Sequence, residues 1–222
     1  MQDNPIVAFC ATYSHRLGEA ACIAAKASLK HWMNLDNIRD KLQYTNRPAF
    51  HQLYKFHHAC STTAAEAISS VHLTWITSSH YPWWGLTNIS CPQLHRGCYR
   101  YQYTMGPSQS TWAAPTPYHN YIMHMHSALQ EHPCMEAVTQ PYFLMFSYNP
   151  KPTYEDNACQ SCQLTMLGLP EFSHILGEEV ERCVSEVRHF LALQVNTYFA
   201  HPLRLLPWKH LGNRTILRLS GV

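Results

Sequence analysis

The stretch of the chain that decides the fold is residues 170–199, with the sequence PEFSHILGEEVERCVSEVRHFLALQVNTYF. On a helical wheel with Glu171 at 0° and 100° per residue, the apolar positions fall between about 100° and 240°. Every charged side chain falls outside that arc. The apolar positions are Phe172, Leu176, Val180, Cys183, Val184, Val187, Phe190, Leu191, Val195 and Tyr198. The pattern predicts an amphipathic helix roughly 40 Å long, which begins near Pro170 and requires other helices to pack along it.

Residues 1–79 are also helix-prone. One helix is expected from Gly18 to about Lys41, because several apolar side chains in this stretch share a narrow helical face. These side chains are Cys22, Ala25, Leu29, Trp32 and Met33. A second helix is expected to begin at Thr63, where Thr63-Ala64-Ala65-Glu66 matches a capping box. Its apolar face would carry Ala64, Ala67, Ile68, Val71 and Trp75.

Residues 80–165 differ in composition, because they hold most of the prolines together with clustered aromatic residues and five of the cysteines. Proline interrupts long helices, so this zone predicts loops and short elements. We expect a short helix over 121–131 and strands around 99–104 and 142–148. Disulfides, a metal, a ligand or ordinary aromatic packing would order the rest.

These zones together predict an all-α or mostly α fold. We expect a single globular domain over 1–222, in which bundle-like helices surround the C-terminal helix. The irregular, Pro-, Cys- and aromatic-rich segment 80–165 would fold over them, and a tail would follow residue 199. No internal repeat at a solenoid period is present.

Composition narrows the classes of partner. Charged residues make up 14% of the chain, apolar residues 46%, and the formal net charge is +2 without a basic run. Strong nucleic-acid binders usually carry a basic patch, so nucleic acid is an unlikely partner here. No apolar run is long enough for a transmembrane segment, and residues 1–12 show no leader pattern. The sequence favours the cytoplasm over a mature secreted form, although Asn88-Ile89-Ser90 and Asn213-Arg214-Thr215 match glycosylation triplets.

The nine cysteines include four in closely spaced pairs. Cys91-x3-His95-x2-Cys98 and Cys159-x2-Cys162 offer thiolate and imidazole ligands at spacings that suit one tetrahedral zinc ion. Such an ion would be a structural clip for the middle zone. Disulfides within either pair, or free thiols, explain the same residues.

A histidine cluster suggests a second metal site. His119, His124, His126 and Glu131 lie close together in the sequence. On a strand, His124 and His126 would point to the same side and could hold a catalytic metal. The spacing H-x-H-x4-E is similar to the first metal motif of cupins over eight residues, but the glycine after the glutamate and a second motif are absent. Helix propensity after His126 argues against a strand, and we therefore interpret the cluster first as ordinary surface or half-buried histidines.

A third group of acidic and histidine side chains lies on the predicted C-terminal helix. Glu-x-x-His pairs bind metal in di-iron bundles only when they face inward. Here the helical wheel places Glu171, His174, Glu178 and His189 on the solvent side, so we interpret them as a solvated face.

Other chemical signals are weak. No phosphate-binding glycine motif or serine nucleophile motif is present. Tyr81-Pro82-Trp83-Trp84 is typical of a packed core corner or, less often, of an exposed binding surface.

Three functional hypotheses remain from the sequence. The first is a helical binding or interaction protein, with a protein partner or a small ligand, and with the zinc clip as an optional structural element. The second is a metal-dependent enzyme that uses the histidine cluster. The third is an artificial or designed protein without a natural function, which the unusual residue usage suggests.

Overall fold

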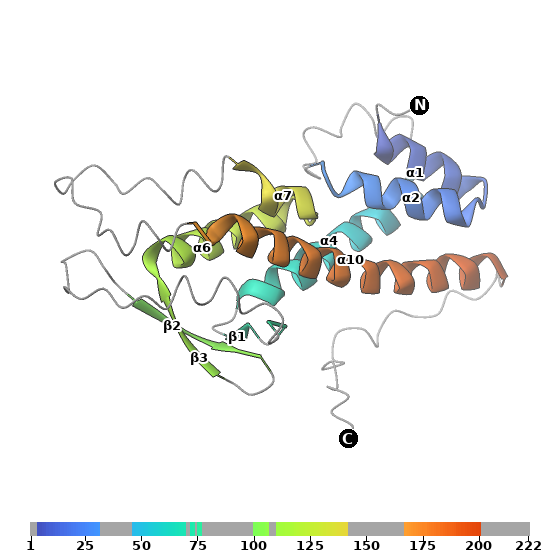
Figure 1. The fold of residues 1–222 in the computed structure, drawn as a ribbon. Coiled ribbons are helices and arrows are strands. Elements are labelled where there is room, and N and C mark those ends of the chain that lie inside the picture. Colours follow the sequence, from blue (N-terminus) through green and yellow to red (C-terminus); the bar gives the residue numbers. More distant parts are fainter. Residues whose placement is uncertain are drawn as a thin grey trace, which may run out of the picture.

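The structure is a computed structural model that describes residues 4–31, 46–69, 72–73, 75–76, 100–106, 110–141 and 167–200. In the last helix, side chains are described as far as Val187. Helices account for 74% of the described residues, and a small sheet lies beside them (Figure 1). The prediction of a mostly α fold is therefore confirmed.

The predicted C-terminal helix is present as α10, Leu169–Ala200. In Figure 1 it runs from the end of the molecule that holds α6 and α7 to the end that holds α1 and α2. The apolar arc faces the core as far as its side chains are described, because Phe172, Leu176, Val180, Cys183 and Val184 are all buried. The helices α4, α7 and α2 pack along it.

Two short helices open the described chain, α1 over Pro5–Ser14 and α2 over Gly18–Ser28. Asn4 caps α1, since its side chain accepts a hydrogen bond from the Val7 amide at 3.4 Å. The helix predicted from Gly18 to about Lys41 is shorter in the structure, where it ends at Ser28. A tight turn follows, in which the Leu29 amide donates to the Lys26 carbonyl and His31 to Ser28. Trp32, Met33 and Lys41 lie outside the described residues.

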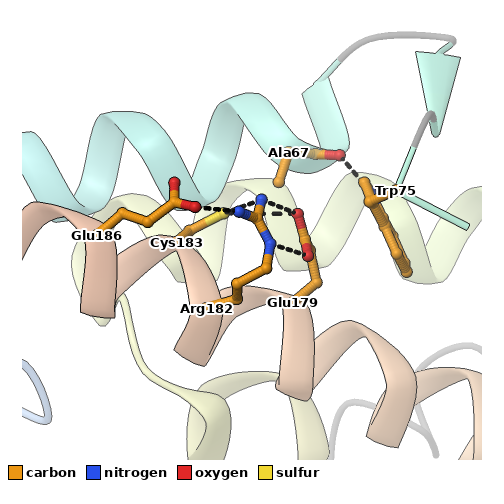
Figure 2. Close-up of polar contacts among 6 residues, drawn as sticks. All are labelled: Ala67, Trp75, Glu179, Arg182, Cys183 and Glu186. Atoms are coloured by element: carbon orange, nitrogen blue, oxygen red, sulfur yellow. Dashed lines mark hydrogen bonds and ion pairs between the residues drawn. The ribbon is translucent and has the colours of Figure 1, made fainter. Parts of the chain in front are cut away.

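The prediction that a helix begins at Thr63 is wrong. Thr63-Ala64-Ala65-Glu66 lies inside α4, which extends over Arg47–Ser69. The apolar spacing of three or four residues starts much earlier than the capping pattern, and its buried positions are Ala49, Leu53, Phe56, Cys60, Ala64 and Ile68. Trp75 lies beyond the end of α4, and its indole N–H donates to the Ala67 carbonyl at 2.9 Å (Figure 2). Val71 is outside the described residues.

The sheet has the strand order β1-β2-β3, with β1 at His72–Leu73, β2 at Arg100–Met105 and β3 at Ser110–Pro115. The predicted strand near 99–104 is confirmed as β2. It pairs parallel with β1 and antiparallel with β3, with Tyr103 opposite Trp112. Gly106 ends β2 at a φ of 64°, which favours glycine, and its amide donates to Leu73. Sequence analysis did not predict β3, and the strand expected at 142–148 lies outside the described residues.

The chain continues from β3 directly into α6, Thr116–Glu131, and then into α7, Met135–Thr139. The predicted helix over 121–131 is confirmed, but it begins earlier because Pro117 occupies the first turn, where proline is tolerated. The Tyr121 hydroxyl donates to the Val138 carbonyl at 2.7 Å and ties α7 to α6. Among the helices of the described residues, none has the length and apolar character needed to cross a membrane.

Candidate functional site

A groove of about 570 Å³ lies between the turn after α2, the C-terminal half of α6, and α7. We call it the α2–α6–α7 groove. Most of the residues that line it carry polar groups, although aliphatic and ring carbons contribute more of its surface than polar atoms do: Lys30, His124, Ser127, Ala128, Glu131, His132, Cys134, Glu136, Ala137 and Gln140. The groove therefore brings charged, imidazole, thiol and amide groups from three separate elements to one concave surface.

An ion pair crosses the groove between its two walls. The Lys30 ammonium donates to the Glu136 carboxylate, and each side chain is about half exposed, at 55% and 50%. Burial is the largest single influence on the pKa of Glu136 and raises it, but the hydrogen bond and charge of Lys30, a backbone hydrogen bond and the Cys134 thiol together outweigh burial, so the pKa is lowered overall. The same hydrogen bond raises the pKa of Lys30. Both groups are therefore charged at neutral pH and largely neutralise each other.

Glu131 supplies the second carboxylate of the groove. It is exposed at the last position of α6, and no ion pair or hydrogen bond joins its side chain to the rest of the described chain. Because the other carboxylate is already paired, Glu131 contributes most of the unneutralised charge of the groove.

His132 caps the C-terminus of α6 and lines the groove. Its amide donates to Ala128 at 2.8 Å, and its carbonyl accepts from the Cys134 amide at 2.8 Å. Its ring Nδ1 is buried and has no hydrogen-bond partner among the described residues. The backbone amide and carbonyl of His132 are thus hydrogen-bonded, whereas its ring Nδ1 is not.

His57 lies on α4 and is not among the residues that line the groove. The side chain is only 5% exposed, its Nδ1 lies 3.4 Å from the Ser61 hydroxyl, and its Nε2 has no partner within the described part of the chain. Burial lowers the pKa of His57 to about 4, with smaller contributions from the charges of His132 and His58. A backbone group of His31 opposes this shift. The ring is therefore neutral at physiological pH.

Cys134 lies at the groove but is not an activated nucleophile. The side chain is 6% exposed, and burial raises the pKa of its thiol. A nucleophilic cysteine requires the thiolate. The buried Cys134 thiol is therefore not poised to act as a nucleophile.

The structure separates the members of the predicted histidine cluster. All four lie on α6, so His124 and His126 diverge as on any helix and do not form the two-histidine strand of a cupin-like site. His124 and Glu131 line the groove, whereas the Nδ1 of His119 forms a hydrogen bond with the Tyr103 hydroxyl at 2.9 Å. His119 also stacks on Tyr101 with ring centroids 3.5 Å apart. No three His, Cys, Asp or Glu side chains of the described residues are grouped to hold a metal ion.

The predicted zinc clip, Cys91, His95, Cys98, Cys159 and Cys162, lies outside the described residues, as do the Tyr81–Trp84 cluster and both glycosylation triplets. The cysteines that the structure does describe are buried free thiols: Cys10, Cys22, Cys60, Cys134 and Cys183. The clip therefore stays a prediction.

The acidic face of α10 is exposed, as predicted, at Glu171, His174 and Glu178. Next to it, Arg182 donates through Nε and Nη2 to Glu179 at 2.7 and 2.6 Å and also pairs with Glu186 (Figure 2). The hydrogen bond to Glu179 raises the pKa of Arg182. Arg182 and Glu186 are exposed, whereas the Glu179 side chain is only 10% exposed, so this network lies at the border between the solvent face and the core. None of its members lines the groove.

Sequence reasoning missed most of the groove. Lys30, Cys134 and Gln140 belong to no motif, and no spacing relates them to one another. The available signal was the pair of neighbouring groups Glu131-His132 and Cys134-x-Glu136 at the end of a predicted helix. Comparisons with protein-family models, curated proteins and solved structures found no match for the chain.

Proposed function

We propose that this chain is a helical binding protein, and that the α2–α6–α7 groove binds a small polar molecule. The observation that carries the proposal is the groove itself. Its volume of about 570 Å³ falls within the range typical of ligand pockets, about 300–1,000 Å³. Its polar groups converge from α2, α6 and α7, whereas most hydrophobic side chains of these helices are buried in the common core.

The charges of the groove favour an organic cation. The lining holds the carboxylates of Glu131 and Glu136 but only one fixed cation, Lys30. Lys30 is already paired with Glu136, so a ligand ammonium group would meet the carboxylate of Glu131. An anionic ligand would be repelled by that carboxylate.

The proposal can be tested with three probes of equal length: putrescine, the corresponding neutral four-carbon diol, and succinate. Each is titrated at pH 7.5 into ¹⁵N-labelled protein, and the amide shifts of Ser127, Ala128 and Gln140 are followed by NMR. We expect saturable shifts with putrescine alone. Glu131→Gln should weaken putrescine binding about tenfold, a loss of roughly 1.4 kcal/mol. The matched control Glu171→Gln, an exposed carboxylate on α10, should bind as the wild type does.

Two outcomes would overturn parts of this proposal. If none of the three probes, and no member of a small polar fragment library, shifts the groove amides, the groove is not a binding site. If succinate binds there instead, the groove is a binding site but the assignment to cations is wrong.

The zinc clip is a separate proposal and is tested by elemental analysis with thermal melts before and after chelation. One tightly held zinc whose removal unfolds the protein would support a structural clip at Cys91, His95, Cys98, Cys159 and Cys162. Absence of bound metal in the purified, reduced protein would contradict it.

A further inference from the structure

Lys30 supplies the ammonium group among the residues that line the α2–α6–α7 groove, and this ammonium already binds one of the two carboxylates there. Lys30 lies in the turn after α2, and its partner Glu136 lies on α7, 106 positions away in the sequence. Glu131 lines the same groove at the end of α6, and its carboxylate has no ion-pair partner in the described part of the chain. The groove therefore holds one carboxylate that is occupied by a cation of the protein itself and one that is not.

The ion pair between Lys30 and Glu136 is exposed, and the fold does not depend on it. The two side chains are 55% and 50% exposed. An ion pair in such a position contributes little net free energy, at most about a fivefold factor in an equilibrium constant. Other contacts hold α7 in place, because the Tyr121 hydroxyl donates to the Val138 carbonyl at 2.7 Å and α7 packs closely on α10. The Lys30 ammonium can therefore be exchanged for another cation while α7 stays where it is.

The two carboxylates are separated by a well-ordered corner between α6 and α7. The His132 amide donates to the Ala128 carbonyl at 2.8 Å, and the Cys134 amide donates to the His132 carbonyl at 2.8 Å. These backbone bonds hold Glu131 and Glu136 on one concave surface with a volume of about 570 Å³. A short aliphatic chain with an ammonium at each end matches this arrangement of charges.

We propose that Lys30 is an internal competitor for the ligand of the groove, and that its ammonium occupies the position on Glu136 that the second ammonium of a diammonium ligand takes. A ligand with one ammonium binds Glu131 and leaves the pair between Lys30 and Glu136 intact. A ligand with two ammonium groups displaces Lys30 and binds both carboxylates. This inference rests on the proposed function of the groove and narrows its ligand class to small aliphatic diammonium ions.

The experiment compares diamines with monoamines of equal chain length. Ethylenediamine, putrescine and hexane-1,6-diamine, each with its matching monoamine, are titrated at pH 7.5 and about 0.15 M salt, and binding is followed by the groove amides. In the wild type we expect the best diamine and its matching monoamine to bind with affinities within about threefold, because displacing Lys30 offsets the second ion pair. Lys30→Gln should raise the affinity of that diamine about tenfold, since a second charge-assisted hydrogen bond becomes available without displacement. The monoamine should gain less than about threefold.

Two control variants separate competition from a general change in charge. Lys26→Gln removes the same charge from α2, but Lys26 pairs with Glu181 and neither residue lines the groove. It should change both affinities by less than about twofold, because salt screens charges that lie outside the groove. Lys30→Arg keeps a cation beside Glu136 and should bind both amines as the wild type does.

The displacement of Lys30 also has a direct signature in the wild type. Saturation with the best diamine should lower the NMR order parameter of the Lys30 Cε methylene, because its ammonium loses the Glu136 carboxylate. Saturation with the matching monoamine should leave this order parameter unchanged.

Several results would overturn the proposal. An equal gain for diamine and monoamine in Lys30→Gln, or the same gain in Lys26→Gln, would assign the effect to net charge. A diamine that binds the wild type but gains nothing in Lys30→Gln would show that Lys30 does not compete, while cation binding by the groove would stand.

The same titrations distinguish failure of this proposal from failure of the proposed function. If the wild type binds no amine but Lys30→Gln binds a diamine, Lys30 is the competitor that we propose and the wild-type groove is not a cation site. If neither protein binds any amine, both proposals are wrong.

Discussion

Phe172 is the side chain that joins the sheet, α6 and α10 into one aromatic cluster. It is fully buried, and its ring centroid lies 5.4 Å from that of Tyr118, 6.0 Å from Tyr121 and 6.1 Å from Trp112. Trp75 also stacks on Phe172, with ring centroids 6.5 Å apart. Edge-to-face and offset arrangements of this kind add stabilisation beyond the buried area of each ring.

Replacing this ring should therefore be costly. Phe172→Ala should lower the free energy of unfolding by about 4 kcal/mol, and Phe172→Leu by about 1.5 kcal/mol, since leucine fills part of the cavity. Urea denaturation followed by tryptophan fluorescence gives both values. Leu167→Ala serves as the control, because Leu167 is 67% exposed and should change stability by less than about 0.5 kcal/mol. A loss below about 1 kcal/mol in Phe172→Ala would contradict this account of the core.

At the scale of elements, sequence analysis predicted α10 most accurately, and α10 is also the helix with the longest uninterrupted run of apolar residues at helical spacing. The apolar spacing of α10 runs through the whole stretch, and no competing signal interrupts it. In α4 the same spacing is present from Ala49 onward, but a capping pattern inside the helix suggested a later start. A local capping pattern and the burial of an apolar helical face can favour different helix starts. In α4 the buried face extends upstream of Thr63, and the helix begins at Arg47.

The stability of a Thr63 variant distinguishes a position inside a helix from an N-cap position. Inside a helix, Thr63→Ala should stabilise the protein by about 0.5 kcal/mol, because alanine has the higher helix propensity. At an N-cap the same change would cost about 1 kcal/mol. Asn4→Ala is the matched comparison, since Asn4 does cap α1 and its loss should cost about 1 kcal/mol. Destabilisation by Thr63→Ala equal to that of Asn4→Ala would place a helix start at Thr63 after all.

The contact between α10 and α7 depends on a glycine. A Cβ atom added to Gly177 would lie 2.8 Å from the Met135 Cγ atom and 3.3 Å from the Thr139 methyl group. We expect Gly177→Ala to lower stability by about 1 kcal/mol, because overpacking outweighs the gain in helix propensity. In a Met135→Ala background, the same substitution should instead stabilise by about 1 kcal/mol. The double-mutant cycle is measured by chemical denaturation of the wild type, both single variants and the double variant. An equal effect of Gly177→Ala in both backgrounds would show that Gly177 and Met135 are not in close contact.

The groove could not be predicted in the same way as the helices. Lys30 and Glu136 are separated by 106 positions, and only the packing of α2 against its neighbours brings them together. His57 shows no distinguishing signal in a chain with 16 histidines. Helical periodicity reports which face of an element is buried, but it carries no information on which elements share a face.

At the scale of the whole molecule, buried neutral histidines make stability depend on pH. The folded-state pKa of His57 is lowered to about 4 by burial, against an ordinary value of about 6.5. Its contribution is therefore fully present above pH 6.5 and is lost progressively as the pH falls toward 4. Burial also lowers the pKa of His119, so this residue acts in the same direction.

The free energy of unfolding should accordingly fall by about 3 kcal/mol between pH 7 and pH 4 through His57 alone. Urea denaturation at half-unit intervals of pH gives the curve. His57→Gln should remove about 3 kcal/mol of the decrease in the free energy of unfolding between pH 7 and pH 4, whereas His58→Gln should leave this decrease unchanged. A wild-type curve without a decline below pH 6.5 would show that His57 is accessible to protons in the folded state.

The position of Phe172 along the chain has a consequence during translation. The ribosome makes Trp112, Tyr118 and Tyr121 well before Phe172, which follows Tyr121 by 51 residues. At about 5 to 20 residues per second, these rings wait roughly 3 to 10 s for the side chain that completes their packing. Until α10 leaves the exit tunnel, the nascent chain presents an aromatic surface that chaperones would recognise, and a message truncated before α10 would yield a product destined for aggregation or proteolysis.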